Sequence, residues 1–466
     1  METLSLSSVD YGIIVVYFIL IIIIGYVVKR RVRNITDYFL AGRRLTLPIF
    51  VATLVSTWYG GILGVGELSF NYGMVNWLTQ GFFWYLSYLF FAFFLANRIR
   101  RSGLFTVPDQ LERFYDKRAR LLGAFFNFIM VTPAPYVLSL GVIFSLIFGW
   151  PAWAGILLGT LVAVFYTLRG GFLGVIYTDF IQFFLMVTGV ALVIPFAVSK
   201  FGGISFLKAN LPATHFTLTG EWTTQMILVW GFIAFWTLVD PSFYQRCYAA
   251  KDDKVPKRGI LLAIVFWGLF DVCTTFTGMY ARAAMPTIDP LTAYPVFAAA
   301  VLPIVLKGLF FAGLIATVMS TIDSFTFLGA MNIAHDYYKR IINPKASEKS
   351  VMRVTKVGIV MTALLALVLA FFFESVVSMW YTIGTIGISA LLIPMLAGFF
   401  YKGKKSGDAA LASMVTGSLT AIVWLAYGWV NMVEGWPTYL LGLEPLYPGL
   451  AVSLVVFVVV NAWRTR

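Results

Sequence analysis

The feature that most constrains this chain is a succession of apolar runs, each about 20 residues long. A helix of that length crosses the hydrocarbon core of a bilayer, which is about 30 Å thick. Charged residues make up only 12% of the chain, which is about half the share usual in soluble domains. The sequence therefore predicts an all-α polytopic membrane protein, because a transmembrane β-barrel would show short alternating segments instead.

Charged residues, Pro and Gly divide the chain into about thirteen transmembrane helices. The predicted spans are 10–29, 46–72, 75–97, 120–147, 150–168, 171–198, 223–249, 256–283, 302–338, 352–373, 376–400, 407–431 and 446–463. Of the 34 Lys and Arg residues, all fall on one side of this arrangement except Lys200, Lys208, Arg282 and Lys307. Basic residues mark cytoplasmic loops, so the N-terminus is predicted to lie outside and the C-terminus in the cytoplasm.

The distribution of charge also bears on partners and location. The net charge of +13 lies in the predicted cytoplasmic loops, where it indicates contact with anionic membrane lipid rather than with nucleic acid. No linker is long enough to hold a soluble domain, so residues 1–466 are predicted to form one transmembrane domain in the plasma (inner) membrane.

Neither catalysis nor a resident cofactor is indicated by the motifs. The two cysteines, Cys247 and Cys273, give no disulfide framework and no zinc spacing. Neither an HExxH pair nor a GxxxxGK[ST] loop occurs, which disfavours an intramembrane protease and an ATP-driven pump. We therefore predict a protein that is not an enzyme and has no cofactor.

The predicted 302–338 span carries an unusual polar stripe, "ATVMSTIDSF". Thr317, Ser320, Thr321 and Ser324 follow the spacing i, i+3, i+4, i+7, which places them on one helix face beside Asp323. Either each hydroxyl bonds the carbonyl four residues earlier in its own helix, or the oxygens of the stripe bind a hard cation. Uncharged ligands would bind such a cation weakly and release it readily, as transport requires.

Two predicted spans look interrupted. Four glycines between residues 60 and 66 lie in the middle of the 46–72 span, where they permit either close helix packing or a break that exposes backbone carbonyls. Asp240-Pro241 interrupts the 223–249 span, because Pro removes a hydrogen bond from the helical ladder. Broken helices at corresponding positions of two five-helix halves indicate an inverted repeat with its site at the membrane midplane. The predicted parts are an N-terminal extra helix and basic loop (1–45), the first repeat (46–198), the second repeat (223–400) and two C-terminal helices (401–466).

A carboxylate lies inside the 171–198 span. Asp179 and Gln182 are one helical turn apart in an otherwise apolar run. A buried Asp in a membrane is costly and needs a partner, so Asp179 either makes a structural pair or lies on a cation path.

Four motifs, in order along the chain, carry a family resemblance: "TVPDQLERFY", "LRGGFLGVIYTDFIQ", "QRCYAAKD" and "VMSTIDS". Together they resemble the sodium:solute symporter family. The resemblance implies a LeuT-type fold with a 5+5 inverted-repeat core and discontinuous helices 1 and 6. It also implies that solute entry is coupled to the inward sodium gradient, with Na⁺ as the coupling ion and the only metal ion bound.

The resemblance further implies a set of site residues. Its conserved sodium site maps to the carbonyls of Leu54, Thr57 and Thr317 and the hydroxyls of Ser320 and Thr321. A possible second cation or proton site maps to Asp179, Asp323 and Ser324, with Asp323 standing where members that bind a second sodium have Ser. The candidate substrate-lining residues are Trp58, Tyr59, Gly61, Gln80, Trp236 and Asp240. Because Gly61, Gln80 and Asp240 replace a Gln, a Glu and an Asn of galactose carriers, a hexose is not predicted.

These observations predict a sodium-coupled symporter that imports a small polar organic solute by alternating access and functions as a monomer. One alternative is a proton-coupled symporter of the same fold that uses Asp179 or Asp323. Another is a passive channel or facilitator, which would show no uphill accumulation of solute.

Overall fold

The computed structural model describes residues 4–28, 31–373, 375–433 and 436–465. Within them the fold is helical except for one short hairpin, β1 (Met432–Val433) and β2 (Trp436–Pro437). The α-helices are α1 (Ser8–Val28), α2 (Ile35–Leu40), α3 (Leu47–Trp58), α4 (Ile62–Tyr72), α5 (Phe83–Phe90), α6 (Ala96–Ser102), α7 (Val107–Phe114), α8 (Lys117–Met130), α9 (Ala134–Phe148), α10 (Ala152–Phe201), α11 (Ile204–Asn210), α12 (Thr224–Ile233), α13 (Pro241–Ala249), α14 (Lys254–Ala284), α15 (Ala293–Val301), α16 (Leu306–Met331), α17 (Glu348–Phe372), α18 (Val376–Phe400), α19 (Gly407–Val430) and α20 (Leu446–Thr465).

Shorter helical turns join these helices. The 3₁₀ segments are η2 (Ala41–Arg43), η5 (Ala213–Phe216), η6 (Ala234–Leu238) and η8 (Leu440–Gly442). The π-helical segments are η3 (Trp77–Phe82), η4 (Phe91–Leu95) and η7 (Asn332–Ile342).

Among the described residues, 11 helical spans, one of which combines α12, η6 and α13, are long and apolar enough to cross a membrane, and the bent pair α3 and α4 can make a twelfth crossing. The predicted 150–168 span corresponds to the shorter apolar helix Ala152–Phe165, which is the first part of α10. A kink at Gly171 (φ 56°, ψ −155°) separates that part from the rest of α10. A side chain at Gly171 would overlap the ring of Tyr38, so both the backbone angle and the packing require glycine. The count of thirteen spans therefore stays a prediction.

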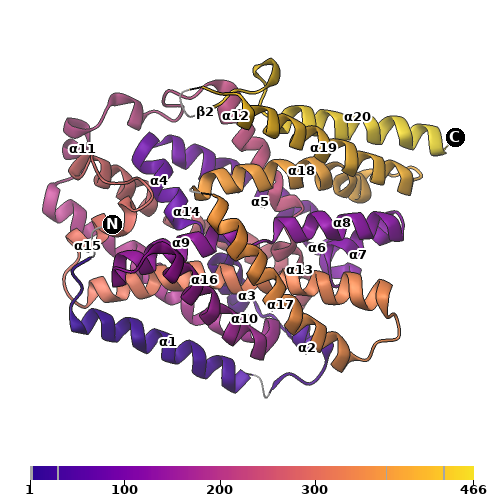
Figure 1. The fold of residues 1–466 in the computed structure, drawn as a ribbon, viewed down its shortest axis with the longest axis horizontal. Helices are drawn as coiled ribbons and strands as arrows, with labels where there is room; N and C mark the ends of the chain where they lie inside the picture. The colour runs from indigo at the N-terminus through magenta and orange to yellow at the C-terminus, as the bar shows by residue number, and fades with distance from the viewer. Residues whose placement is uncertain (1–3, 29–30, 374, 434–435, 466) are drawn as a thin grey trace.

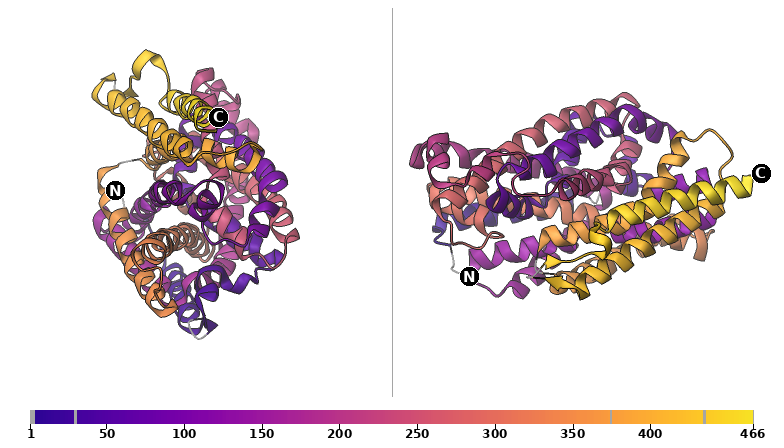
Figure 2. Two further views of the ribbon diagram at one scale, coloured as in Figure 1. Left: turned by 90° about the vertical axis from the view of Figure 1, so that its right-hand side faces the viewer. Right: turned by 90° about the horizontal axis from the view of Figure 1, so that it is seen from above.

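The long helices run mainly along one axis of the molecule, with α1 at one edge and α19 and α20 at the opposite edge (Figures 1 and 2). The two ends of the chain lie at opposite ends of this axis (Figure 1). Helix α16 occupies the interior, where it packs against α10, α17, α1, α9 and α3. Its residues are buried from Phe310 to Met331. The polar stripe of α16 therefore faces protein on every side.

Both predicted helix breaks are confirmed. Helices α3 and α4 meet at an angle of 58° across Tyr59–Gly61. In the other broken span, α12 passes through η6 and stops, and α13 starts at Pro241. The Asp240 side chain caps α13 by accepting the backbone N–H groups of Ser242 (2.8 Å) and Phe243 (3.2 Å).

Candidate functional site

The end of α3 meets the polar stripe of α16. The last carbonyls of a helix have no partner within it, and α3 ends at Trp58. The Ser320 hydroxyl donates to the carbonyl of Ser56 (2.9 Å), and the Thr321 hydroxyl donates to that of Thr57 (2.8 Å). This approach needs glycine at position 60, because a Cβ there would overlap the Thr321 side chain.

The same two hydroxyls also face the carbonyl of Thr317, at 2.8 Å from Ser320 and 3.4 Å from Thr321. Three carbonyl oxygens and two hydroxyl oxygens therefore converge at the junction of α3 and α16. Such neutral hard oxygens are suited to a hard cation such as Na⁺.

The structure brings together Thr57, Thr317, Ser320 and Thr321 of the predicted sodium-site residues. Leu54 lies earlier in α3, where its carbonyl can accept the N–H of Trp58 in the helical ladder. The carbonyl that faces Ser320 belongs instead to Ser56, which the sequence analysis did not single out.

One interpretation of the stripe is that each hydroxyl bonds the carbonyl four residues earlier in its own helix. Thr317 does so, because its hydroxyl donates to the carbonyl of Gly313 (2.7 Å). Ser320 and Thr321 combine an intrahelical contact with one that crosses to α3. The stripe therefore serves both helix geometry and the junction between the helices.

A second polar cluster lies close to the first and contains a buried ion pair. Asp179 of α10 accepts a hydrogen bond from Thr53 of α3. The Arg246 side chain of α13 places Nη2 at 3.6 Å from the Asp179 carboxylate and 2.9 Å from the hydroxyl of Ser324. Asp179 and Ser324 are thus together as predicted, while Asp323 accepts the backbone N–H of Ser324 (2.8 Å). The Arg246 guanidinium is a further member of this cluster that the sequence pattern did not reveal.

A cavity opens beside the break between α3 and α4. It contains about 710 Å³ of empty space, a figure that includes its open mouth. Of the predicted substrate residues, those that line it are Trp58, Tyr59, Gly61, Gln80 and Trp236. Asp240 instead accepts the indole N–H of Trp236 (3.1 Å) and so holds that ring in place.

The rest of the wall is mainly aromatic. The lining residues that the sequence analysis missed include Trp84, Tyr88, Tyr136, Trp230, Trp267, Asp271 and Trp380. The rings are closely packed: the centroids of Tyr88 and Trp267 are 4.4 Å apart, and those of Trp58 and Trp84 are 5.4 Å apart. The indole of Trp380 occupies the place where a side chain at Gly61 would lie.

Asp271 of α14 is the carboxylate in this wall. It accepts hydrogen bonds from the hydroxyls of Tyr59 (2.9 Å) and Tyr85, and no Lys or Arg among the described residues forms an ion pair with it. The sequence signal for Asp271 was its place in the apolar run "GLFDVCTTF", since a carboxylate within a membrane span is a functional candidate by default.

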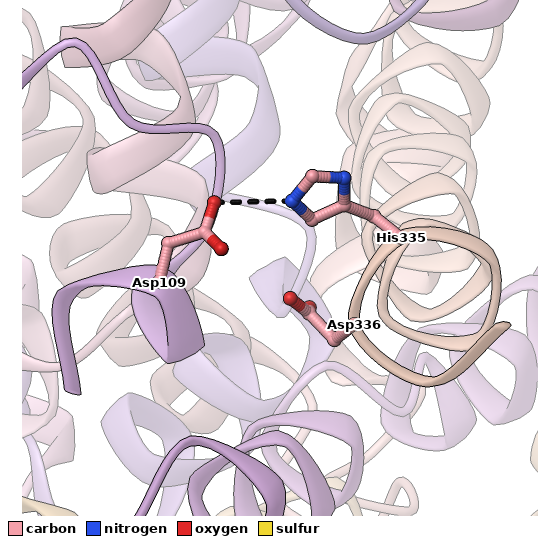
Figure 3. Close-up of side chains that lie close together, drawn as sticks. All are labelled: Asp109, His335 and Asp336. Carbon is pink, nitrogen blue, oxygen red and sulfur yellow. Dashed lines mark hydrogen bonds and ion pairs between the residues drawn. The ribbon is translucent and has the colours of Figure 1, made fainter. Parts of the chain in front are cut away.

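A third cluster joins Asp109 of α7 to His335 and Asp336 of η7 (Figure 3). By residue type these three side chains could hold a metal ion. Guanidinium groups already balance their charge, because Arg340 lies 3.2 Å from Asp109 and Arg120 lies 3.7 Å from Asp336. We interpret the cluster as an ion-pair network that fastens α7 to η7.

The pKa of Asp109 is set by two opposing effects in that network, burial and the neighbouring basic groups. Burial opposes its ionisation, but the hydrogen bond from His335 and the charges of His335, Arg340 and Arg120 outweigh this effect. Together they lower the pKa of Asp109 to about 2.

Comparison with known proteins places these features in context. The sequence pattern of the sodium:solute symporter family matches residues 38–417. The chain is 30% identical to high-affinity choline transporter 1 of Drosophila melanogaster, over 94% of this chain and 72% of that protein. It is 26% identical to the osmoregulated proline transporter of Bacillus subtilis, over 97% of this chain and 94% of that protein. Its fold is similar to that of a Na⁺-coupled sialic acid symporter solved in a substrate-bound outward-open state (TM-score 0.83, 18% identity, 98% of each chain).

Proposed function

The chain belongs to the sodium:solute symporter family, whose members couple solute transport to sodium, and we propose that its solute is a small methylated ammonium cation of the choline class. The observation that carries this proposal is the cavity wall, in which Trp and Tyr rings surround a buried carboxylate that lacks a cationic partner among the described residues. Aromatic faces attract alkylammonium groups through their quadrupole, and most strongly where water is excluded.

Asp271 supplies the negative charge that such a solute would neutralise. A cation that enters the cavity would pair with this carboxylate, while its methyl groups would contact the rings of residues such as Trp58 and Trp380. Among the residues that the structure describes, neither Lys nor Arg lines the cavity, which disfavours an anionic solute such as a sugar acid.

A zwitterion such as proline is the second candidate. The break before α4 leaves backbone N–H groups at the start of that helix, beside the cavity at Gly61 and Val65, and such groups favour a carboxylate. The similarity to a proline transporter supports this alternative.

For the coupling ion, we propose a site at the junction of α3 and α16. Its ligands would be the carbonyls of Ser56, Thr57 and Thr317 and the hydroxyls of Ser320 and Thr321. The residues that follow, Trp58 and Tyr59, line the solute cavity, so one chain segment would serve both ligands. We further propose a monomeric, single-domain carrier with an outer N-terminus and a cytoplasmic C-terminus, not an enzyme, that works by alternating access.

Thermal unfolding of the purified protein in Na⁺ or K⁺ salts tests the sodium site. A ligand that binds only the folded state raises the melting temperature by mass action, so we expect a Na⁺-specific rise. Ser320→Ala and Thr321→Ala should abolish it. Thr362→Ala, which removes another buried hydroxyl that bonds its own helix on α17, should preserve it. A Na⁺ response that survives in both site variants would contradict this assignment.

Uptake into proteoliposomes tests the solute. An inward Na⁺ gradient should drive uphill accumulation of choline, and Asp271→Asn should weaken choline binding about tenfold or more while the response to Na⁺ remains. Accumulation of proline instead would favour the second candidate. Uptake driven by a pH gradient in Na⁺-free buffer would support proton coupling, and downhill flux alone would support a facilitator.

A further inference from the structure

We propose that the cavity recognises an oxygen atom of its solute as well as the ammonium group, and that the indole N–H groups of Trp84 and Trp267 donate to that oxygen. The inference rests on the proposed function above and narrows the solute class. The solute would be a methylated ammonium compound that carries an oxygen acceptor at the end of a short chain, as choline does. A methylated ammonium ion without an oxygen should bind more weakly.

Unpaired hydrogen-bond donors surround the cavity. Four of its lining side chains carry a buried N–H group with no acceptor among the residues that the structure describes: Gln80, Trp84, Trp230 and Trp267. Trp236 is the contrasting case, because its indole N–H donates to Asp240 (3.1 Å). Buried donors are nearly always paired in folded proteins, so unpaired donors around one cavity indicate that a ligand supplies the acceptor.

Two of these donors lie close to the carboxylate that would hold the ammonium group. Trp267 and Asp271 are four residues apart on α14, so they share one helix face, with about 5–6 Å between their Cβ atoms. The rings of Trp267 and Trp84 both pack against Tyr88, with centroid distances of 4.4 and 6.3 Å. A solute whose ammonium group pairs with Asp271 could therefore reach these indoles with a group at the end of a short chain.

Burial is the reason that the solute must bring an acceptor. Trp267 is only 1% exposed and Trp84 is 9% exposed. Water can pair with their N–H groups when no solute is bound, but a solute that fills the cavity displaces that water. A solute without an oxygen would leave both donors unpaired in an apolar wall, and this weakens its binding. Sites built to hydrogen-bond a hydroxyl reject the analogue that lacks it for the same reason.

The test compares choline with ethyltrimethylammonium, in which a hydrogen atom replaces the hydroxyl group. Binding is measured by isothermal titration calorimetry of the purified protein in Na⁺ salt. We expect the wild type to bind choline at least about tenfold more tightly. Trp84→Phe and Trp267→Phe each keep an aromatic ring but remove the N–H, so each should bring the ratio of the two affinities toward one. Trp153→Phe, at an exposed position of α10, should keep the wild-type ratio.

The outcomes separate this inference from the proposed function. Equal affinities for the two cations in the wild type would overturn the inference and leave the choline class intact. A preference for choline that survives in both tryptophan variants would also overturn it, because the hydroxyl would then bind elsewhere. Binding of proline but of neither cation would overturn the proposed function, and the inference with it. If one variant does not fold, the ratio in the other variant gives the answer.

Discussion

At the scale of single residues, the absence of one side chain at Gly61 shapes the solute cavity. The backbone there (φ −83°, ψ 23°) is open to any residue, so glycine is needed for space rather than for conformation. A Cβ would overlap the indole of Trp380 and push it from the wall. We expect Gly61→Ala to weaken solute binding about tenfold or more, with the effect measured by the solute-dependent shift in melting temperature.

Gly174→Ala is the matched control. Gly174 lies in α10 with no heavy atom within 4 Å of its added Cβ, so alanine should fit there. It should leave solute binding unchanged and stabilise the helix by about 0.5–1 kcal/mol. Unchanged affinity in Gly61→Ala would contradict the placement of Trp380 in the wall.

The same scale shows what sequence could and could not reveal about the site. Ser320 and Thr321 were found because they follow a helical spacing within one span. The places of Asp271 and Trp380 in the cavity wall depend on contacts with residues far away in the sequence. In addition, an aromatic residue in an apolar run has the same sequence pattern whether it faces lipid, core or a cavity. Ser56 rather than Leu54 faces Ser320 because α3 ends at Trp58, and helix ends are uncertain by one or two residues from sequence.

At the scale of elements, the length of apolar runs predicted the helices well because the bilayer fixes that length. The break at Asp240-Pro241 was visible because proline cannot continue the helical ladder. The kink at Gly171 was expected only as a span boundary, since its positive φ and its packing against Tyr38 depend on tertiary contacts.

The network between α7 and η7 gives a prediction at this scale. Asp109→Asn removes a carboxylate that three basic groups face, and it leaves Arg120, which is 4% exposed, less compensated. We expect a loss of about 3–5 kcal/mol in unfolding free energy, measured as a lower melting temperature. Asp408→Asn, which breaks more exposed ion pairs with Arg118 and Arg464, should cost less than about 1 kcal/mol.

The stability that Asp109→Asn loses should depend on pH in a definite direction. The folded pKa of Asp109, about 2, lies below its ordinary value of 3.8, so the ionised carboxylate stabilises the protein fully when the pH is above 3.8. This stabilisation is lost only as the pH falls from about 4 toward 2. The difference between wild type and Asp109→Asn should therefore persist between pH 5 and 8, and a difference that disappears on acidification to pH 5 would contradict the ion-pair assignment.

At the scale of the whole molecule, orientation in the membrane can be tested with cysteines. Cys247 and Cys273 are both buried, so a cysteine introduced on the surface should be labelled selectively by a membrane-impermeant maleimide. Thr219 and Lys404 are exposed and lie on opposite sides in the predicted topology. Thr219→Cys should react in intact cells, whereas Lys404→Cys should react only after permeabilisation. The reverse pattern would invert the predicted orientation.

Coupling between sodium and solute is also a property of the whole molecule. The end of α3 offers the carbonyls of Ser56 and Thr57 to the proposed sodium site and the rings of Trp58 and Tyr59 to the cavity. An ion that fixes this segment therefore also fixes the wall that receives the solute. By linkage, if sodium raises the affinity for choline by some factor, choline must raise the affinity for sodium by the same factor.

We expect that factor to be about 5–150, the usual range for coupled sites. Four dissociation constants from ligand-dependent melting close the cycle: sodium with and without saturating choline, and choline with and without saturating sodium. Equal factors are required by thermodynamics and so check the measurements. A factor of one would mean that the two ligands bind independently, and it would rule out the end of α3 as their shared element.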